Sequence, residues 1–311
     1  MNRRQLLAGL AFAPVGAAAV AQTPPTIGVL AQSDEIFDAA LFRKMLLERG
    51  WPERAYRLEV RTAQGRLDRL DDMARELVAA KVTAIVAIYT PSALAAKRAT
   101  RTIPIVMTAG DPVGTGIVGN LARPEGNVTG VDTAGADLSG KRVEVLREVL
   151  PSMRRLGLLI SPADPFSKRL TEMTRDAATP FGITVDVFPA AADLEQAMRQ
   201  LAAAGCQGVV VQQGLPQGAV GARIAAARMP AVSGDRQFVA AGGLLAVSTP
   251  FAERYRLLAQ SLDKVLKGVP PRDLPVVQTT EIQILVNRAS ARALGLTLPP
   301  LLLSRAEEII D

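Results

Sequence analysis

The residue types that carry most enzyme chemistry are largely missing from this chain. Its 311 residues include no histidine and a single cysteine, Cys206. Histidine-dependent triads, histidine metal sites, disulfides within the chain and cysteine-held metal centres are therefore excluded. We expect no catalytic residues, no metal site and no cofactor, and we expect that the protein is not an enzyme.

Two short motifs match patterns known from enzymes, and both have simpler explanations. Residues 114–119 fit the G-x-G-x-x-G pattern of dinucleotide sites, but Pro124 follows too soon for the helix that such a site requires. Residues 261–264 fit the S-x-x-K pattern of penicillin-recognising enzymes, but they lie in a predicted amphipathic helix without the accompanying motifs. We interpret both matches as coincidences.

The remaining candidates are polar and aromatic residues that follow predicted strands, where open α/β sheets bind their ligands. In the first half of the chain these candidates are Ser33, Tyr89, Thr90, Ser92, Gly110 and Asp111. Pro91 suits a first helical position, so we expect Thr90 to be an N-cap and the helix start to bind a carboxylate. Thr90 and Ser92 would otherwise serve only as caps, and Tyr89 would either stack on a ligand or simply pack.

Asp111 has two possible roles. It could accept hydrogen bonds from a ligand ammonium group, or it could hold the following Gly-rich turn together through backbone bonds. In the second half of the chain the candidates that follow predicted strands are Ser161, Asp164, Phe166, Gln212, Gln213 and Asp235. Their amide and carboxylate groups suit a polar zwitterion.

Alternating strand and helix patterns must position these candidates. Apolar runs at 26–31, 84–88 and 103–107 predict strands, with amphipathic helices between them. This rhythm indicates βαβ units around a parallel sheet that is covered on both faces. It breaks at the Gly-rich segment 110–130 and then resumes, which predicts two similar lobes.

Composition and the first residues indicate where the protein acts. The chain has 49% hydrophobic and 4% aromatic residues and a formal charge of +6 without a basic block, so we expect no nucleic-acid partner.

The first residues predict a signal peptide. Arg3 and Arg4, an apolar centre and Ala19-Val20-Ala21 predict a twin-arginine-like signal peptide at 1–21, cleaved near Ala21. A retained membrane anchor is the alternative. The mature protein is therefore expected in the periplasm.

Several motifs together resemble one family. They are GDPVGTG at 110–116, LARPEGNVTG at 121–130, KRVEVL at 141–146, FVAAGGL at 238–244, KVLKG at 264–268, DLPV at 273–276 and ALGLTLPP at 293–300. In these segments the chain resembles the ABC transporter substrate-binding proteins of the tryptophan/tyrosine type.

The resemblance implies the α/β fold of a type I periplasmic binding protein, in which two Rossmann-like lobes with parallel sheets are joined by three crossings of a hinge. The N-lobe would comprise 26–131 plus 249–271, and the C-lobe 132–248 plus 272–311. We expect a monomer that closes on a small ligand, an amino acid or related carboxylate, and delivers it to an ABC permease in the inner membrane. A sensor that signals to a membrane receptor without transport is the alternative.

Overall fold

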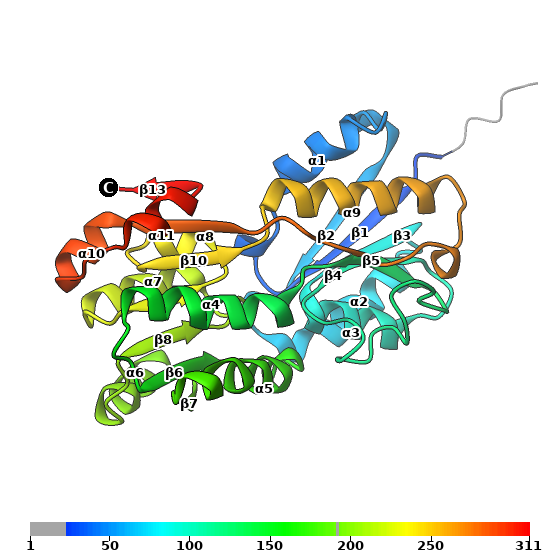
Figure 1. Cartoon of the computed structure of the whole chain (residues 1–311). Helices are drawn as coiled ribbons and strands as arrows, with labels where there is room; N and C mark the ends of the chain where they lie inside the picture. Colours follow the sequence, from blue (N-terminus) through cyan, green and yellow to red (C-terminus); the bar gives the residue numbers. More distant parts are fainter. Residues whose placement is uncertain (1–22, 191–192) are drawn as a thin grey trace, which may run out of the picture.

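The computed structural model describes residues 23–190 and 193–311, so the predicted signal peptide at 1–21 lies outside the described residues. Two α/β lobes lie side by side, each built on a mostly parallel sheet with helices on both faces (Figure 1). This arrangement confirms the predicted fold class. None of the helices in the described part of the chain combines the length and hydrophobicity needed to cross a membrane.

The N-lobe sheet has the strand order β11-β5-β4-β3-β1-β2. Its strands are β1 (Thr26–Ala31), β2 (Arg57–Thr62), β3 (Ala84–Ile88), β4 (Ile105–Ala109), β5 (Val128–Asp132) and β11 (Val277–Gln278). Its α-helices are α1 (Ala39–Leu47), α2 (Leu70–Ala79), α3 (Tyr89–Ala99) and α9 (Phe251–Leu266). Helices α1 and α9 cover one face and α2 and α3 the other (Figure 1). Strands β3, β4 and β5 are buried throughout, as expected for a sheet covered on both faces.

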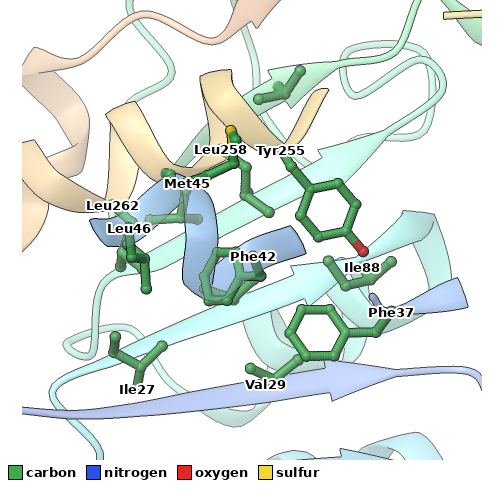
Figure 2. Packing of buried hydrophobic residues seen from close by; sticks show 14 of the residues in the cluster. Ile27, Val29, Phe37, Phe42, Met45, Leu46, Ile88, Tyr255, Leu258 and Leu262 are labelled. Atoms are coloured by element: carbon green, nitrogen blue, oxygen red, sulfur yellow. The ribbon is translucent and has the colours of Figure 1, made fainter. Parts of the chain in front are cut away.

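Helix α9 returns from late in the sequence to complete the N-lobe core. Leu258 and Leu262 project from it toward Phe42 of α1, with Ile27 and Val29 of β1 beneath them (Figure 2). All five side chains are fully buried. Burying each of these side chains contributes roughly 1.5–3 kcal/mol, so this packing fixes α9 to the N-lobe.

The C-lobe sheet has the strand order β13-β12-β10-β9-β8-β6-β7, with only the β10–β12 pair antiparallel. Its strands are β6 (Arg155–Ile160), β7 (Thr184–Pro189), β8 (Gly208–Val211), β9 (Ala231–Ser233), β10 (Leu245–Ser248), β12 (Gln283–Asn287) and β13 (Glu308–Ile310). Its α-helices are α4 (Gly135–Val149), α5 (Phe166–Ala178), α6 (Leu194–Ala203), α7 (Gln217–Ala226), α8 (Arg236–Ala240), α10 (Arg288–Leu294) and α11 (Pro300–Arg305). Helices α4, α5, α10 and α11 share one core with the sheet, and α6, α7 and α8 share the other.

The chain passes between the two sheets at 133–134, 249–250 and 279–282. The third connection comes later than the boundary expected at 271–272. Val277 and Gln278 pair with Val131 and Asp132, so β11 belongs to the N-lobe sheet. The proline-rich segment before it forms a short 3-10 turn that stays on the N-lobe, because Leu274 is buried in that lobe's core.

Candidate ligand-binding cleft

Two hollows lie between the lobes. The inner cavity has a volume of about 30 Å³. It is lined by seven of the predicted site residues: Tyr89, Thr90, Gly110, Asp164, Phe166, Gln212 and Gln213. Thr133, Gly135, Arg142, Leu170 and Gly214 complete its walls. The outer hollow, of about 540 Å³, is lined by the predicted residues Ser33 and Ser161 and shares Gly214 with the inner cavity.

The junction of β3 and α3 forms the N-lobe wall of the inner cavity. Helix α3 begins at Tyr89, and the predicted N-cap role of Thr90 is therefore wrong. Tyr89 adopts a left-handed backbone with φ of 67°, which turns the chain from strand to helix without a loop. Such a conformation costs on the order of 1–3 kcal/mol and is concentrated at functional sites. Thr90 lies in the first turn and lines the cavity, whereas Ser92 is fully buried and lines neither hollow.

Arg254 of α9 holds the Tyr89 ring in place. Its Nη1 donates to the Tyr89 hydroxyl over 3.2 Å, and its guanidinium lies 4.0 Å from the centroid of the Phe251 ring. Asp235 of the C-lobe lines neither hollow and accepts a hydrogen bond from the backbone N–H of Gln237 at the start of α8. Burial raises the pKa of Asp235, and the positive charge of Arg254 partly offsets that shift.

Arg142 brings a buried positive charge to the C-lobe side of the cavity. Only 2% of the residue is exposed, and its Nε donates to the Val247 carbonyl over 3.1 Å. Among the described residues, its buried Nη2 has no hydrogen-bond partner and no carboxylate forms an ion pair with its guanidinium. Burial lowers the pKa of Arg142 to about 10, so the guanidinium stays protonated at neutral pH. A buried charge without a partner is costly, and an anion in the cavity would remove that cost.

Gly234 leaves the space that the Arg142 side chain occupies. A Cβ at this position would overlap both Arg142 Nη2 and the Gln213 side chain, whose amide donates to the Gly234 carbonyl. Neither Arg142 nor Gly234 was among the site residues expected from the sequence, although Arg142 lies in the KRVEVL motif at 141–146 and Gly234 directly precedes the candidate Asp235.

Asp164 brings a carboxyl group to the cavity, and a network of hydrogen bonds holds it in place. Its Oδ1 accepts from the backbone N–H of Phe166 over 2.9 Å, and its Oδ2 accepts from Gln212 Nε2 over 2.8 Å. Gln212 Oε1 in turn accepts from the Ser161 N–H over 2.8 Å. Burial raises the pKa of Asp164 to about 6 despite these bonds. The inner cavity therefore combines a guanidinium with a titratable carboxyl group.

Asp111 lies outside both hollows. Its Oδ1 accepts from the Gly114 N–H over 2.7 Å, which is the turn-holding role that the sequence left as one alternative. Its Oδ2 pairs with Arg169 Nε over 2.8 Å. Because Arg169 belongs to α5 of the C-lobe, this ion pair joins the two lobes beside the cleft.

The described residues offer little for other chemistry. Residues 23–190 and 193–311 contain no group of three or more His, Cys, Asp or Glu side chains that could hold a metal ion. The glycines of 114–119 form turns and do not open a helix, and residues 261–264 lie within α9.

Comparisons with known proteins agree with this architecture. The family model described as ABC transporter substrate binding protein matches residues 40–310. The chain therefore belongs to the ABC transporter substrate-binding protein family, which confirms the resemblance noted in the sequence.

Relatives and solved structures add detail. The chain is 26% identical over 267 residues to the "Tyrosine-binding protein" of Clostridioides difficile, covering 82% of this chain and 75% of that one. It is similar to the crystal structure of the ABC domain in complex with L-Trp from Streptococcus pneumonia, with a TM-score of 0.82, 25% identity and coverage of 93% and 100%. A conserved domain protein from Vibrio cholerae gives a TM-score of 0.83 at 25% identity, with coverage of 92% and 100%.

Proposed function

We propose that this protein is the periplasmic receptor of an ABC importer and that it captures an α-amino acid between its lobes. The observation that carries the proposal is the buried guanidinium of Arg142, a residue that lines the inner cavity and whose Nη2 has no hydrogen-bond partner among the described residues. Guanidinium groups bind carboxylates through charge-assisted hydrogen bonds. The names of the relatives, which mention tyrosine and L-Trp, support the same ligand class.

The charges of the cavity match the two charges of an amino acid. The α-carboxylate would accept hydrogen bonds from Arg142 and lie near Thr90 in the first turn of α3, where free N–H groups favour an anion. The α-ammonium would pair with Asp164. Tyr89 and Phe166 add apolar walls to the cavity.

Binding is coupled to closure because the cavity has walls from both lobes. Thr90 and Tyr89 belong to the N-lobe, whereas Arg142 and Asp164 belong to the C-lobe. A ligand that contacts both lobes binds the closed form more tightly and shifts the population toward it. The closed monomer would then present both lobes to the permease in the inner membrane.

A thermal-shift screen tests this proposal. The protein is unfolded and refolded to remove carried ligand, then heated with amino acids, small carboxylates, nucleosides and sugars. A ligand that binds only the folded state at about 100 times its Kd stabilises it by about 2.7 kcal/mol. We expect an α-amino acid among the clear hits. Hits confined to sugars or nucleosides, or no hit on well-folded protein, would contradict the proposed ligand class.

Replacing Gly234 with alanine should weaken amino-acid binding about ten-fold, because the new methyl group displaces Arg142 and Gln213 from the cavity wall. Gly218→Ala is the matched control, since a Cβ at Gly218 meets nothing within 4 Å. Isothermal titration of both variants measures the effect. Equal affinities for the two variants would show that the position of Arg142 does not matter for binding.

Replacing Arg169 with glutamine should weaken binding about two- to five-fold by removing the ion pair with Asp111 that joins the lobes. The effect is small because Arg169 is 39% exposed, and partly exposed ion pairs contribute at most about 1 kcal/mol. Small-angle scattering should show a larger radius of gyration for the ligand-saturated variant if closure becomes incomplete. Arg175→Gln, in the same helix, is the control, and identical behaviour of the two variants would disprove a role in closure.

A further inference from the structure

The Gly-rich motif at 110–116 meets the opposite lobe directly. We propose that Gly110 and Gly135 form a seat for the Phe166 ring, and that the lobes close fully only when the ring lies in this seat. Phe166 begins α5 of the C-lobe, whereas Gly110 directly follows β4 of the N-lobe. The inference rests on the proposed function, in which closure accompanies binding, and it gives these residues a role that contact with the ligand does not require.

The Phe166 ring lies against the backbone of Gly110. A Cβ at position 110 would lie 3.0 Å from Cζ of the ring, 3.2 Å from Cε2 and 3.3 Å from Cε1. Contacts of a Cβ at these distances are rare in proteins, so a methyl group at 110 would push the ring away from the N-lobe. The two lobes therefore approach this closely because position 110 has no side chain.

Gly135 forms the other side of the seat. It begins α4, immediately after the chain crosses between the sheets at 133–134. A Cβ at 135 would lie 2.8 Å from the Gly110 Cα, 2.9 Å from the Gly110 carbonyl oxygen and 3.1 Å from Phe166 Cζ. The two nearest atoms belong to the backbone of the other lobe and cannot rotate away. An alanine at 135 would therefore hold the lobes apart.

A polar contact continues the seat along α5. Arg169 lies one turn after Phe166, and its Nε donates to Asp111 Oδ2 over 2.8 Å. A Cβ at Gly114 would overlap the Asp111 carboxylate, whose Oδ1 accepts from the Gly114 N–H. The glycines at 110 and 114 and the aspartate between them thus each serve the contact with the first turns of α5.

Cross-linking of the ligand-free protein tests the seat without any ligand. Gln237 of α8 donates to the Glu35 carbonyl over 3.4 Å, which is a contact between the lobes made by other elements. Glu35→Cys and Gln237→Cys are introduced together, and their reaction with bismaleimidoethane measures how often the lobes are closed. The native Cys206 is buried. We expect Gly135→Ala to slow this cross-linking about ten-fold, because the added methyl group opposes closure.

Affinity and stability give two further measurements. The standard L-amino acid that binds the parent most tightly should bind Gly135→Ala weaker by the same factor, because binding and cross-linking depend on the same closed population. The midpoint of urea denaturation should stay close to that of the parent, since each lobe keeps its own core. Gly140→Ala, in the same helix, is the matched control. A Cβ there meets the Ala177 Cβ at an ordinary 3.7 Å, so closure and affinity should not change.

A double-mutant cycle tests the contact with the ring itself. Gly110→Ala should slow cross-linking in the parent but not in Phe166→Leu, which lacks the ring. Equal slowing in both backgrounds would overturn the proposed seat. A lowered urea midpoint in Gly135→Ala would also overturn it, because the glycine would then be needed for folding and not for closure.

The outcomes separate this inference from the proposed function. If amino acids bind the parent but Gly135→Ala cross-links as fast as Gly140→Ala, the seat is wrong and the receptor proposal stands. If Gly135→Ala slows cross-linking but no α-amino acid binds the parent, the seat stands and the proposed ligand class fails.

Discussion

Replacing Arg142 with methionine should weaken the binding of α-amino acids at least 100-fold and make the ligand-free protein more stable. Truncating one partner of a buried, hydrogen-bonded charge pair costs about 2–5 kcal/mol in binding. In the ligand-free protein the same guanidinium is buried, and within residues 23–190 and 193–311 its only hydrogen-bond partner is the Val247 carbonyl. Methionine fills similar space without charge, so we expect the free energy of unfolding to rise by about 1–3 kcal/mol.

Two measurements on each protein check this prediction: the Kd by isothermal titration and the free energy of unfolding by urea denaturation. Arg147→Met is the control because Arg147 lies on the same helix, is exposed, and stacks on the Phe181 ring 3.7 Å away. It should leave the Kd unchanged. A loss of both affinity and stability in Arg142→Met would mean that Arg142 is a structural residue and not a ligand anchor.

Lowering the pH from 7 to 5 should weaken amino-acid binding about ten-fold while it stabilises the ligand-free protein. Burial raises the pKa of Asp164 to about 6, so at pH 5 only about one protein in ten has the carboxylate that pairs with the ligand ammonium. The stability changes in the opposite direction. A carboxyl whose pKa is raised by folding stabilises the folded state fully below its unfolded pKa of 3.8, and this contribution is lost as the pH rises through 6.

Variants at two buried carboxyl groups separate these effects. Burial also raises the pKa of Asp132 to about 6, and each group should contribute about 1 kcal/mol to the gain in stability from pH 7 to pH 5. Asp164→Asn should abolish the pH dependence of affinity. Asp132→Asn should reduce only the pH dependence of stability, since Asp132 does not line the inner cavity. An affinity for amino acids that stays constant between pH 5 and 7 in the parent protein would exclude Asp164 as the ammonium site.

The sequence predicted the lobes and the side of the sheets where the cleft lies, because periodicity and apolar runs are local properties. The strand expected at 84–88 is β3 of the structure, and polar residues after several strands do line the cleft. The helical periodicity of the segment around Arg142 also indicates that this residue is buried. It lies four residues after Leu138 and four before Leu146, on the apolar stripe of α4, where a charge must be buried.

Other features depend on contacts between distant segments and leave no local pattern. The left-handed turn at Tyr89 replaces the N-cap expected at Thr90, because the Tyr89 N–H finds an acceptor in Thr108 on the neighbouring strand. The partner of Asp111 is Arg169, 58 residues later and in the other lobe. The third connection shifts to 279–282 because β11 pairs with β5, a strand from the first half of the chain.

The most direct test of a carboxylate anchor in the cleft removes the charge from the ligand and leaves the protein intact. The best-binding amino acid and its carboxamide, which keeps the ammonium group and the side chain, are titrated into the refolded protein at pH 7. If Arg142 binds the carboxylate, the carboxamide should bind at least 100-fold more weakly than the acid. Equal affinities for the acid and the carboxamide would contradict the account, because the buried guanidinium would then play no part in recognition.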